Sequence, residues 1–337
     1  MAINEPPFSL TNKTITLVAQ ISEAVGRLTA EFEKEKLLRL RKVNRMRTVQ
    51  GSLAIEGNTL SEQQITAILD GKHIIAPPKE VLEAHNAITA YEKMEGWQPA
   101  NCDDLLAAHL VLMKGLTTDA GMFRAKGVGV MSGDKVVHMA PQADRVAELI
   151  LGLLDWVNTT DIHPLIVSCV FHYEFEFIHP FSDGNGRMGR LWQTLILSKW
   201  HDVFVNIPVE SLVHQYQEDY YAAIRQSTKL TDSSPFIEFM LRMILNAIET
   251  SSRQNEGLNE GLNEGLNEGL NEGLNLSAVD KAILELIAQD VFITNIAISE
   301  KLTKSISTIE RHIKMLKESN LLQRVGSKKT GHWKILK

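Results

Sequence analysis

The sequence is poor in cysteine, and this scarcity excludes several classes of protein. Cys102 and Cys169 are the only two, each in an apolar context and neither in a Cys-x-x-Cys pair, so we expect no disulfide framework. No run of about 18 apolar residues is present, and residues 1–10 lack the charged and apolar regions of a signal peptide. We therefore expect free thiols, a cytoplasmic location and no membrane span.

Charge of either sign is also modest. The 337 residues carry a net charge of −6, with 23% charged and 44% hydrophobic residues, which is ordinary for a soluble globular protein. The chain as a whole is therefore not a nucleic-acid-binding surface, and any basic surface must be local. Its length allows two or three domains.

A short glycine-rich turn in the middle of the chain gathers the residues most suited to chemistry. Gly184 and Gly186 flank Asn185 and have no β-carbon, so backbone N–H groups there can approach an anion closely. If Asn185 caps the helix that follows, the unpaired N–H groups of the first turn face the same place. Arg187 and Arg190 stand three residues apart, so they share a helical face and can fork onto phosphate oxygens. The turn therefore predicts a polyphosphate site.

Two further side chains lie in or beside this turn. Asp183 is a hard oxygen ligand, suited to holding Mg²⁺ together with substrate phosphates. His179 has a pKa near neutrality and can take a proton from an incoming hydroxyl. A base, a metal ligand and an anion cradle together predict a nucleotidyl or phosphoryl transferase.

The run from His179 to Arg190 matches the Fic signature, His-x-Phe-x-Asp/Glu-Gly-Asn-Gly-Arg-x-x-Arg, at all eight specified positions. The chain thus resembles Fic enzymes, which transfer AMP from ATP to a protein hydroxyl and release pyrophosphate. The resemblance implies that His179 deprotonates the target Ser, Thr or Tyr, that Phe181 anchors the loop and that Asp183 holds Mg²⁺. It also implies a nucleotide site formed by Gly184, Asn185, Gly186, Arg187 and Arg190.

A second short motif precedes this signature. Ser52 and Glu56 lie four residues apart on one helical face, and Gly57-Asn58 is a helix-stop signal. Residues 59–62 then fit a capping box that starts another helix. The pattern resembles the inhibitory motif of Fic proteins, which implies that Glu56 pairs with Arg190 in the place of the γ-phosphate.

Two β-branched runs around a Ser-Gly-Asp turn, at 127–139, predict a β-hairpin on an otherwise helical chain. Fic proteins have a hairpin flap here that clamps the target segment by strand addition. The resemblance assigns target docking to Val128, Gly129, Val130 and Met131. A hairpin without a docking role is the alternative.

The segments around the signature are predicted to be helical. Residues 171–177 alternate like a strand, but the longer pattern fits a helical period, and we expect a helix. His109 is expected to be a packed histidine and not a metal ligand, since no second ligand stands at metal spacing. Tyr220 and Tyr221 belong to an Asp-Tyr-Tyr element that borders the adenine pocket in related enzymes; ordinary amphipathic tyrosines are the alternative.

The C-terminal part differs in charge and pattern. Residues 255–274 are five copies of Asn-Glu-Gly-Leu, which we interpret as a flexible or partly helical linker, with an interaction helix as the alternative. Residues 276–337 carry a net charge of +5 against −11 for the remainder, and the order helix, helix-turn-helix, hairpin predicts a winged helix. Ser307, Arg311 and Lys314 are the candidates for DNA contact; dimerisation or presentation of targets is the alternative.

The sequence therefore predicts a mainly α protein, with a Fic-type helical core, a β-hairpin flap and a small α+β winged-helix domain. The expected segments are 1–95 with the inhibitory motif, 96–250 as the catalytic core, 251–275 as linker and 276–337 as winged helix. The expected activity is Mg²⁺-dependent protein adenylylation from ATP, autoinhibited by Glu56. Removal of AMP from modified proteins and a DNA-binding regulator with a non-catalytic Fic-like sensor core are the alternatives. A homodimer is left open.

Overall fold

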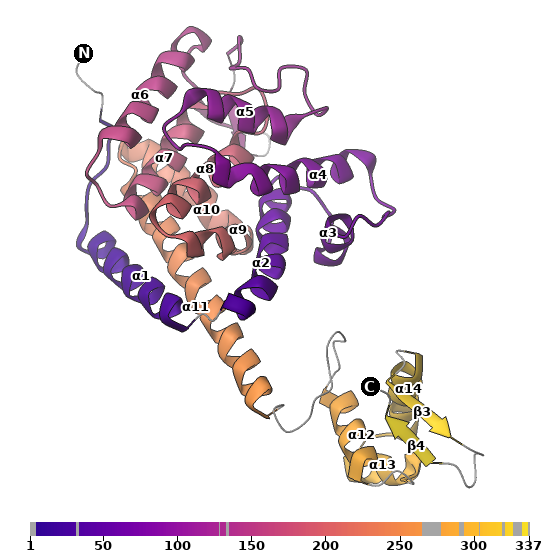
Figure 1. Ribbon diagram of the computed structural model, residues 1–337. Helices are drawn as coiled ribbons and strands as arrows, with labels where there is room; N and C mark the ends of the chain where they lie inside the picture. Colours follow the sequence, from indigo (N-terminus) through magenta and orange to yellow (C-terminus); the bar gives the residue numbers. More distant parts are fainter. Residues whose placement is uncertain are drawn as a thin grey trace. The chain divides into compact units, whose positions relative to one another are not determined.

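Helices supply nearly all of the regular structure in this computed structural model, as the sequence predicts (Figure 1). The structure describes residues 5–31, 34–127, 129–132, 135–264, 278–289, 293–302, 304–318, 321–325 and 332–335. The chain divides into two compact units, Met1–Asn255 and Glu256–Lys337. Each has its own hydrophobic core, and each is described by itself.

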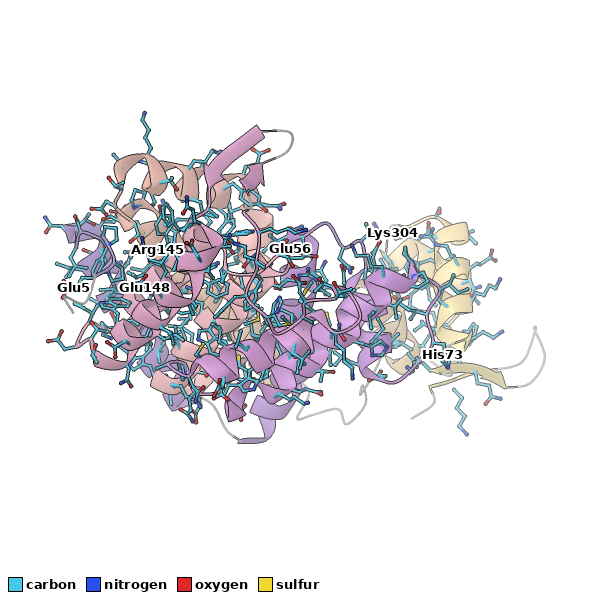
Figure 2. All side chains as sticks on the ribbon, turned by 90° about the horizontal axis from the view of Figure 1, so that it is seen from above. Glu5, Glu56, His73, Arg145, Glu148 and Lys304 are labelled. Carbon is cyan, nitrogen blue, oxygen red and sulfur yellow. The ribbon has the colours of Figure 1, made fainter. Side chains whose placement is uncertain are left out.

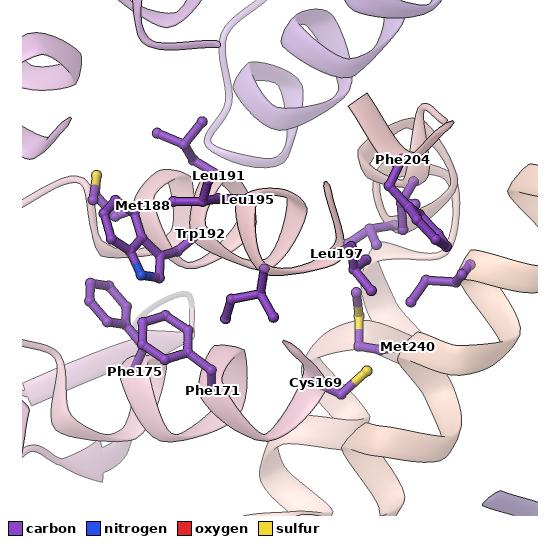
Figure 3. Close-up of a cluster of buried hydrophobic side chains, with 14 of the residues drawn as sticks. Cys169, Phe171, Phe175, Met188, Leu191, Trp192, Leu195, Leu197, Phe204 and Met240 are labelled. Carbon is purple, nitrogen blue, oxygen red and sulfur yellow. The ribbon is translucent and has the colours of Figure 1, made fainter. Parts of the chain in front are cut away.

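Two buried helices form the centre of the first unit. They are α7 (Pro164–Ile178) and α8 (Asn185–Trp200), which pack against each other. Phe171 and Phe175 of α7 face Trp192 of α8, whereas Leu191 points to the other side of α8, and all four side chains are fully buried (Figure 3). Burial of each such side chain is worth about 1.5–3 kcal/mol. The loop that joins the two helices carries the signature.

The α7 helix is buried around most of its circumference, and this explains its misleading sequence pattern. Every residue from Leu165 to Tyr173 is buried, so polar residues do not mark a solvent face and the helical period is weak. Pro164 occupies the first turn, where no N–H partner is needed, and the His163 side chain accepts a hydrogen bond from the Leu165 N–H. The predicted helix is confirmed.

The N-terminal helices surround this centre in the first unit (Figure 1). They are α1 (Asn12–Glu31), α2 (Lys34–Ile55), α3 (Glu62–Leu69) and α4 (Pro78–Lys93), followed by the 3-10 turn η1 (Met94–Gly96). The capping box before α3 was expected over 59–62, and this was wrong. The Ser61 hydroxyl accepts from the Gln64 N–H at 3.2 Å, and the Gln64 side chain accepts from the Ser61 N–H at 2.9 Å. Thr59 is instead bound to Glu80.

The predicted β-hairpin is present between α5 (Cys102–Met113) and α6 (Val146–Thr159). Strands β1 (Gly129–Ser132) and β2 (Lys135–Met139) pair antiparallel, with a register shift between Val130 and Met131. A 3-10 turn, η2 (Ala143–Arg145), connects the hairpin to α6. Short elements complete the unit after α8: η3 (Asp202–Asn206), α9 (Val209–Gln215) and α10 (Gln217–Leu230).

The helix α11 (Ser234–Glu264) extends beyond the predicted end of the core at residue 250. It continues into the first copies of the Asn-Glu-Gly-Leu repeat, so the repeat is helical up to Glu264. The remaining copies lie outside the described residues. Among the described helices, none combines the length and apolar character that crossing a membrane requires.

The second unit is a winged helix, as predicted. Helices α12 (Ala278–Gln289), α13 (Asn295–Leu302) and α14 (Ile306–Glu318) precede an antiparallel hairpin of β3 (Leu322–Val325) and β4 (His332–Ile335). Ile283, Ile309 and Trp333 lie in its core. The Trp333 indole N–H donates to the Ile293 carbonyl at 3.0 Å, which fastens the hairpin to the chain segment before α13.

Candidate active site

His179 lies at the turn where α7 ends. Its backbone is left-handed, with φ 51° and ψ 62°, and its N–H donates to the Phe175 carbonyl at 2.9 Å. A residue with a β-carbon adopts this conformation only when its surroundings hold it there. Nδ1 of the imidazole is 3.4 Å from the Glu176 carbonyl and 3.9 Å from the Glu176 carboxylate. The turn thus directs a partly exposed imidazole out of the end of a buried helix.

The Asn185 amide closes the signature loop. Its side-chain oxygen accepts from the Phe181 N–H at 2.9 Å, and its side-chain nitrogen donates to the Phe181 carbonyl at 2.8 Å. Gly184, with φ 84°, is the residue that caps α8. The conditional prediction that Asn185 is the N-cap was therefore wrong, because both of its hydrogen bonds are made with the main chain of Phe181. Asn185 therefore shapes the signature loop from within.

A stacked aromatic pair supports the same loop from inside. Phe181 is fully buried, and its ring lies parallel to that of His109 with 3.6 Å between centroids. His109 accepts from the Gly121 N–H through Nδ1, so its Nε2 carries the proton that is donated to the Asp183 carbonyl at 3.0 Å. Burial lowers the pKa of His109, which favours this neutral form. The predicted packed histidine is confirmed, and its support of the loop is an addition that no local pattern signalled.

Arg190 is held at one end of the loop by the N-terminal motif. One guanidinium nitrogen donates to the Glu56 carboxylate at 2.7 Å and to the Ser52 carbonyl at 3.0 Å, and Nε donates to the Ser52 hydroxyl at 3.2 Å. Burial alone would lower the pKa of Arg190, but the groups around it, with the charge of Glu56 first and its hydrogen bond added, together outweigh burial and the pKa is raised. The structure therefore brings Arg190 together with Ser52 and Glu56, which lie 138 and 134 residues earlier in the sequence.

Glu56 also lies against the anion loop itself. A β-carbon built at Gly186 would collide with the Glu56 carboxylate oxygen, so the glycine allows this close approach. Figure 2 shows Glu56 among the packed side chains of the first unit. Its side chain is nonetheless 35% exposed, against 2% for that of Arg190. The carboxylate thus approaches the buried arginine from the side that solvent reaches.

Arg187, one turn earlier on α8, has looser partners. It donates to the Asp183 carboxylate at 3.2 Å and lies 3.8 Å from the Glu83 carboxylate. Its Nε is buried and has no hydrogen-bond partner in the described part of the chain. Such an orphaned donor on a buried guanidinium costs about 1–3 kcal/mol.

Glu83 and Glu176 belong to this site, although no short sequence pattern signalled either. Glu83 on α4 accepts from the Asn58 side chain at 2.9 Å, so it connects the end of the inhibitory motif to Arg187. Glu176 on α7 faces His179, and one of its carboxylate oxygens is buried without a partner in the described residues. Burial raises the pKa of Glu176 to about 7.

Asp183 is the one metal candidate from the sequence, and its chemistry fits Mg²⁺. Its side chain is 57% exposed, and one oxygen accepts from the Gly184 N–H at 2.6 Å. No group of three or more His, Cys, Asp and Glu gathers in the described residues. Mg²⁺ binds through one or two carboxylates with phosphates and water as its other ligands, so a single exposed aspartate beside an anion cradle suits it.

The two tyrosines of the Asp-Tyr-Tyr element differ in burial. Tyr220 is 2% exposed, and its hydroxyl bonds Nε2 of the buried His172 at 3.1 Å. Burial raises the pKa of Tyr220 and lowers that of His172 to about 3, so both are neutral core residues. For Tyr220, this burial favours the alternative of an ordinary packed tyrosine, and its contact with a nucleotide stays a prediction. Tyr221 is half-buried and remains the candidate for adenine contact.

The remaining predicted residues are placed only in part. Gly129, Val130 and Met131 form β1, whereas Val128 lies outside the described residues. Arg311 and Lys314 are exposed on α14 of the second unit. Ser307 lies in the same helix, and its side chain is outside the described part.

The geometry above agrees with comparisons to known proteins. Residues 99–197 match the Fic/DOC family. A crystal structure of a Fic family protein from Desulfovibrio desulfuricans G20 is 39% identical, covers 98% of both chains and superposes with a TM-score of 0.73. The chain belongs to the Fic family.

The Fic relatives whose names state an activity share a smaller fraction of identical residues with this chain. Protein adenylyltransferase fic-1 of Caenorhabditis elegans is 31% identical over 227 residues, and protein adenylyltransferase Fic of Nematostella vectensis is 29% identical over 211 residues. These regions make up 60% and 59% of this chain, but 42% and 46% of the relatives. The chain thus spans less than half the length of these curated relatives. Residues 276–323 match the winged helix-turn-helix DNA-binding family.

Proposed function

We propose that this protein is an ATP-dependent protein adenylyltransferase, held inactive by Glu56. The observation that carries the proposal is the arrangement on one loop: a partly exposed imidazole on one side and two buried guanidinium groups on the other. The relatives named adenylyltransferases support the reaction type. A triphosphate whose terminal phosphates contact Arg187 and Arg190 has its α-phosphate directed toward His179.

The reaction then follows from the residues present. His179 accepts the proton of a target hydroxyl, whose oxygen attacks the α-phosphorus of ATP. The new bond joins that oxygen to phosphorus, the bond between the α-phosphorus and the bridging oxygen breaks, and pyrophosphate leaves with the electron pair. Arg187 and Arg190 stabilise the charge that develops on it. Mg²⁺ held by Asp183 would neutralise phosphate charge when bound.

The proposed inhibition is a competition for Arg190. The Glu56 carboxylate occupies one donor of the guanidinium at 2.7 Å, and a phosphate oxygen needs the same donor. Two anions cannot share that donor at contact distance, so ATP binds productively only when Glu56 moves away or is removed. Glu56 follows the last residue of α2 and is more exposed than its partner, which makes such a displacement feasible.

The proposal is tested by incubating the Glu56→Gly protein and the wild type with bacterial lysate and ATP labelled at the α- or the γ-phosphate. We expect label from the α-position, and none from the γ-position, to enter protein in the Glu56→Gly reaction. Labelled products are then incubated with the wild type, which tests removal of AMP. Absence of α-label in any protein would contradict the adenylyltransferase, and γ-label in protein would assign phosphorylation instead.

A second candidate function belongs to the C-terminal unit. We propose that it binds DNA, because it matches a DNA-binding family and because α14 presents the exposed cations Arg311 and Lys314. Two lost phosphate contacts would lower the slope of log affinity against log salt by about 2. Mobility shifts with random duplex DNA and the Arg311→Ala/Lys314→Ala protein measure this. Equal retention of DNA by the variant would contradict the role of α14.

A further inference from the structure

Arg124 is a buried arginine that makes no ion pair in the described part of the chain. It is 4% exposed and lies between α5 and the β1–β2 hairpin. Within the described residues, its side-chain hydrogen bonds all go to main-chain carbonyls. Burying a guanidinium without a carboxylate partner costs free energy. The groups that Arg124 binds should therefore explain why an arginine stands at this position.

The first two of these groups belong to the catalytic turn. Nε donates to the His179 carbonyl at 2.7 Å, and one terminal nitrogen donates to the Ile178 carbonyl at 3.3 Å. The main-chain N–H of Arg124 donates to the Pro180 carbonyl at 3.0 Å. The carbonyls of Ile178 and His179 are among those that the end of α7 leaves unpaired, and a cation at this end also favours the helix dipole. Arg124 thereby holds the left-handed turn that positions the imidazole.

The other two groups lie at the base of the hairpin, where the chain enters β1 and leaves β2. One terminal nitrogen donates to the Lys126 carbonyl at 2.9 Å, and the other donates to the Pro141 carbonyl at 2.6 Å. These carbonyls stand just before β1 and just after β2. The planar, rigid guanidinium therefore fixes both chain segments at the base of the hairpin against the main chain of His179.

We infer that Arg124 is a positioning residue that sets the hairpin at a fixed distance from His179, so that an acceptor hydroxyl held along the hairpin meets the imidazole. This inference rests on the proposed adenylyl transfer. Misplacement of reacting groups by about 1 Å can cost 10²-fold in rate. The side chain touches neither nucleotide nor acceptor, so nucleotide affinity should be independent of it.

The test uses Arg124→Lys in the full-length Glu56→Gly protein, because lysine keeps the charge and cannot bridge four carbonyls. The control is Arg145→Lys, since Arg145 is exposed and, among the described residues, its ion pair is with Glu148 at 3.1 Å. We expect Arg124→Lys to slow α-label transfer to lysate proteins by about 10- to 100-fold, with ATP affinity unchanged. Arg124→Ala should regain part of the rate with millimolar methylguanidinium.

A second readout does not depend on activity. Hydrogen exchange of the amides in 129–132 and 135–139 should be about tenfold faster in Arg124→Lys than in Arg145→Lys. The reason is that the base of the hairpin loses its hydrogen bonds to the guanidinium. Unchanged exchange and unchanged transfer in a folded Arg124→Lys protein would overturn the inference. If the Glu56→Gly protein transfers no label at all, the proposed function fails, and the exchange measurement alone decides the role of Arg124.

Discussion

The two arginines of the signature lie one helical turn apart on α8 and have very different surroundings. At the closed end, formed by Ser52, Glu56 and Arg190, the guanidinium makes three hydrogen bonds at 2.7–3.2 Å. At the open end, formed by His179, Asp183 and Arg187, the Arg187 guanidinium has one hydrogen bond at 3.2 Å and a carboxylate at 3.8 Å. Its Nε has no partner in the described part of the chain.

Under the proposed function, this difference explains how the loop can hold its catalytic residues in place while Glu56 keeps it inactive. The open end has an exposed Asp183 carboxylate and a partly exposed His179 imidazole, and the buried Nε of Arg187 has no partner in the described residues. The closed end has its ligand already, in the form of the protein's own carboxylate. The proposed function places the chemistry at the open end and the control of the terminal phosphates at the closed end, and each prediction below tests one of these two roles.

The largest effect is expected at the open end. His179→Ala in the Glu56→Gly protein should lower AMP transfer by about 10²- to 10⁴-fold, because the general base is lost. ATP affinity should be unchanged, because both arginines remain. Rates of α-label transfer and calorimetric ATP binding measure the two quantities, with the exposed His73→Ala as control. Retained transfer would remove His179 from the reaction.

Glu176 should make stability and rate depend on pH. Its pKa is raised to about 7 by burial, so the folded protein binds the proton more tightly than the unfolded chain does. Its contribution to stability is then fully present below pH 4.5 and is lost as pH rises through 7, with a total change on the order of 3 kcal/mol. In Glu176→Gln, the free energy of unfolding measured with denaturant should fall less as pH rises from 4.5 to above 7.

A matched control for this variant lies two residues earlier on α7. Burial also raises the pKa of Glu174 to about 7, but a separation of two residues on a helix turns its side chain to the opposite side of α7 from that of Glu176. Both Glu→Gln variants should flatten the stability profile, whereas only Glu176→Gln should shift the pH dependence of AMP transfer. Identical rate profiles for the two variants would show that Glu176 does not act on His179.

The smallest effect is expected at Glu83, which lies 3.8 Å from Arg187. Glu83→Gln removes the charge and keeps an oxygen for the Asn58 side chain, so ATP affinity should rise about two- to fivefold, as for a weak ion pair. Glu92→Gln on the same helix, where Glu92 pairs with Arg45, is the control. Lower ATP affinity in Glu83→Gln would mean that Glu83 orients Arg187 for phosphate and does not compete with it.

The sequence predicted those parts of the molecule that depend on local chemistry. The glycine turn, the hairpin around Ser-Gly-Asp and the winged helix follow from backbone requirements and from the period of apolar residues, and the structure has all three. The pairing of Glu56 with Arg190 was expected through family resemblance, since no local rule joins residues 134 positions apart.

The sequence could not reveal contacts whose partners are main-chain atoms or distant helices. Arg124 binds main-chain carbonyls, which every residue type has. The residues around it in the sequence therefore cannot predict its hydrogen bond to His179, 55 residues later. The burial of Tyr220 could not be predicted for a related reason. The apolar period of a helix does not show whether a tyrosine beside the apolar face is covered by a residue of another helix, here His172. The capping box was misplaced by two residues since Thr59 and Ser61 are both suitable caps and only Glu80 decides between them.

Competition between Glu56 and the terminal phosphates is tested most directly by measuring nucleotide affinity. Calorimetric titration of the wild type and of Glu56→Gly with Mg-ATP and with AMP separates the two ends of the loop, because AMP has no phosphates that reach Arg190. Loss of a charge-assisted hydrogen bond of about 1.5–3 kcal/mol predicts that Glu56→Gly tightens ATP binding by about 10- to 100-fold. The affinity for AMP should stay unchanged. Equal ATP affinities in the two proteins would contradict the account.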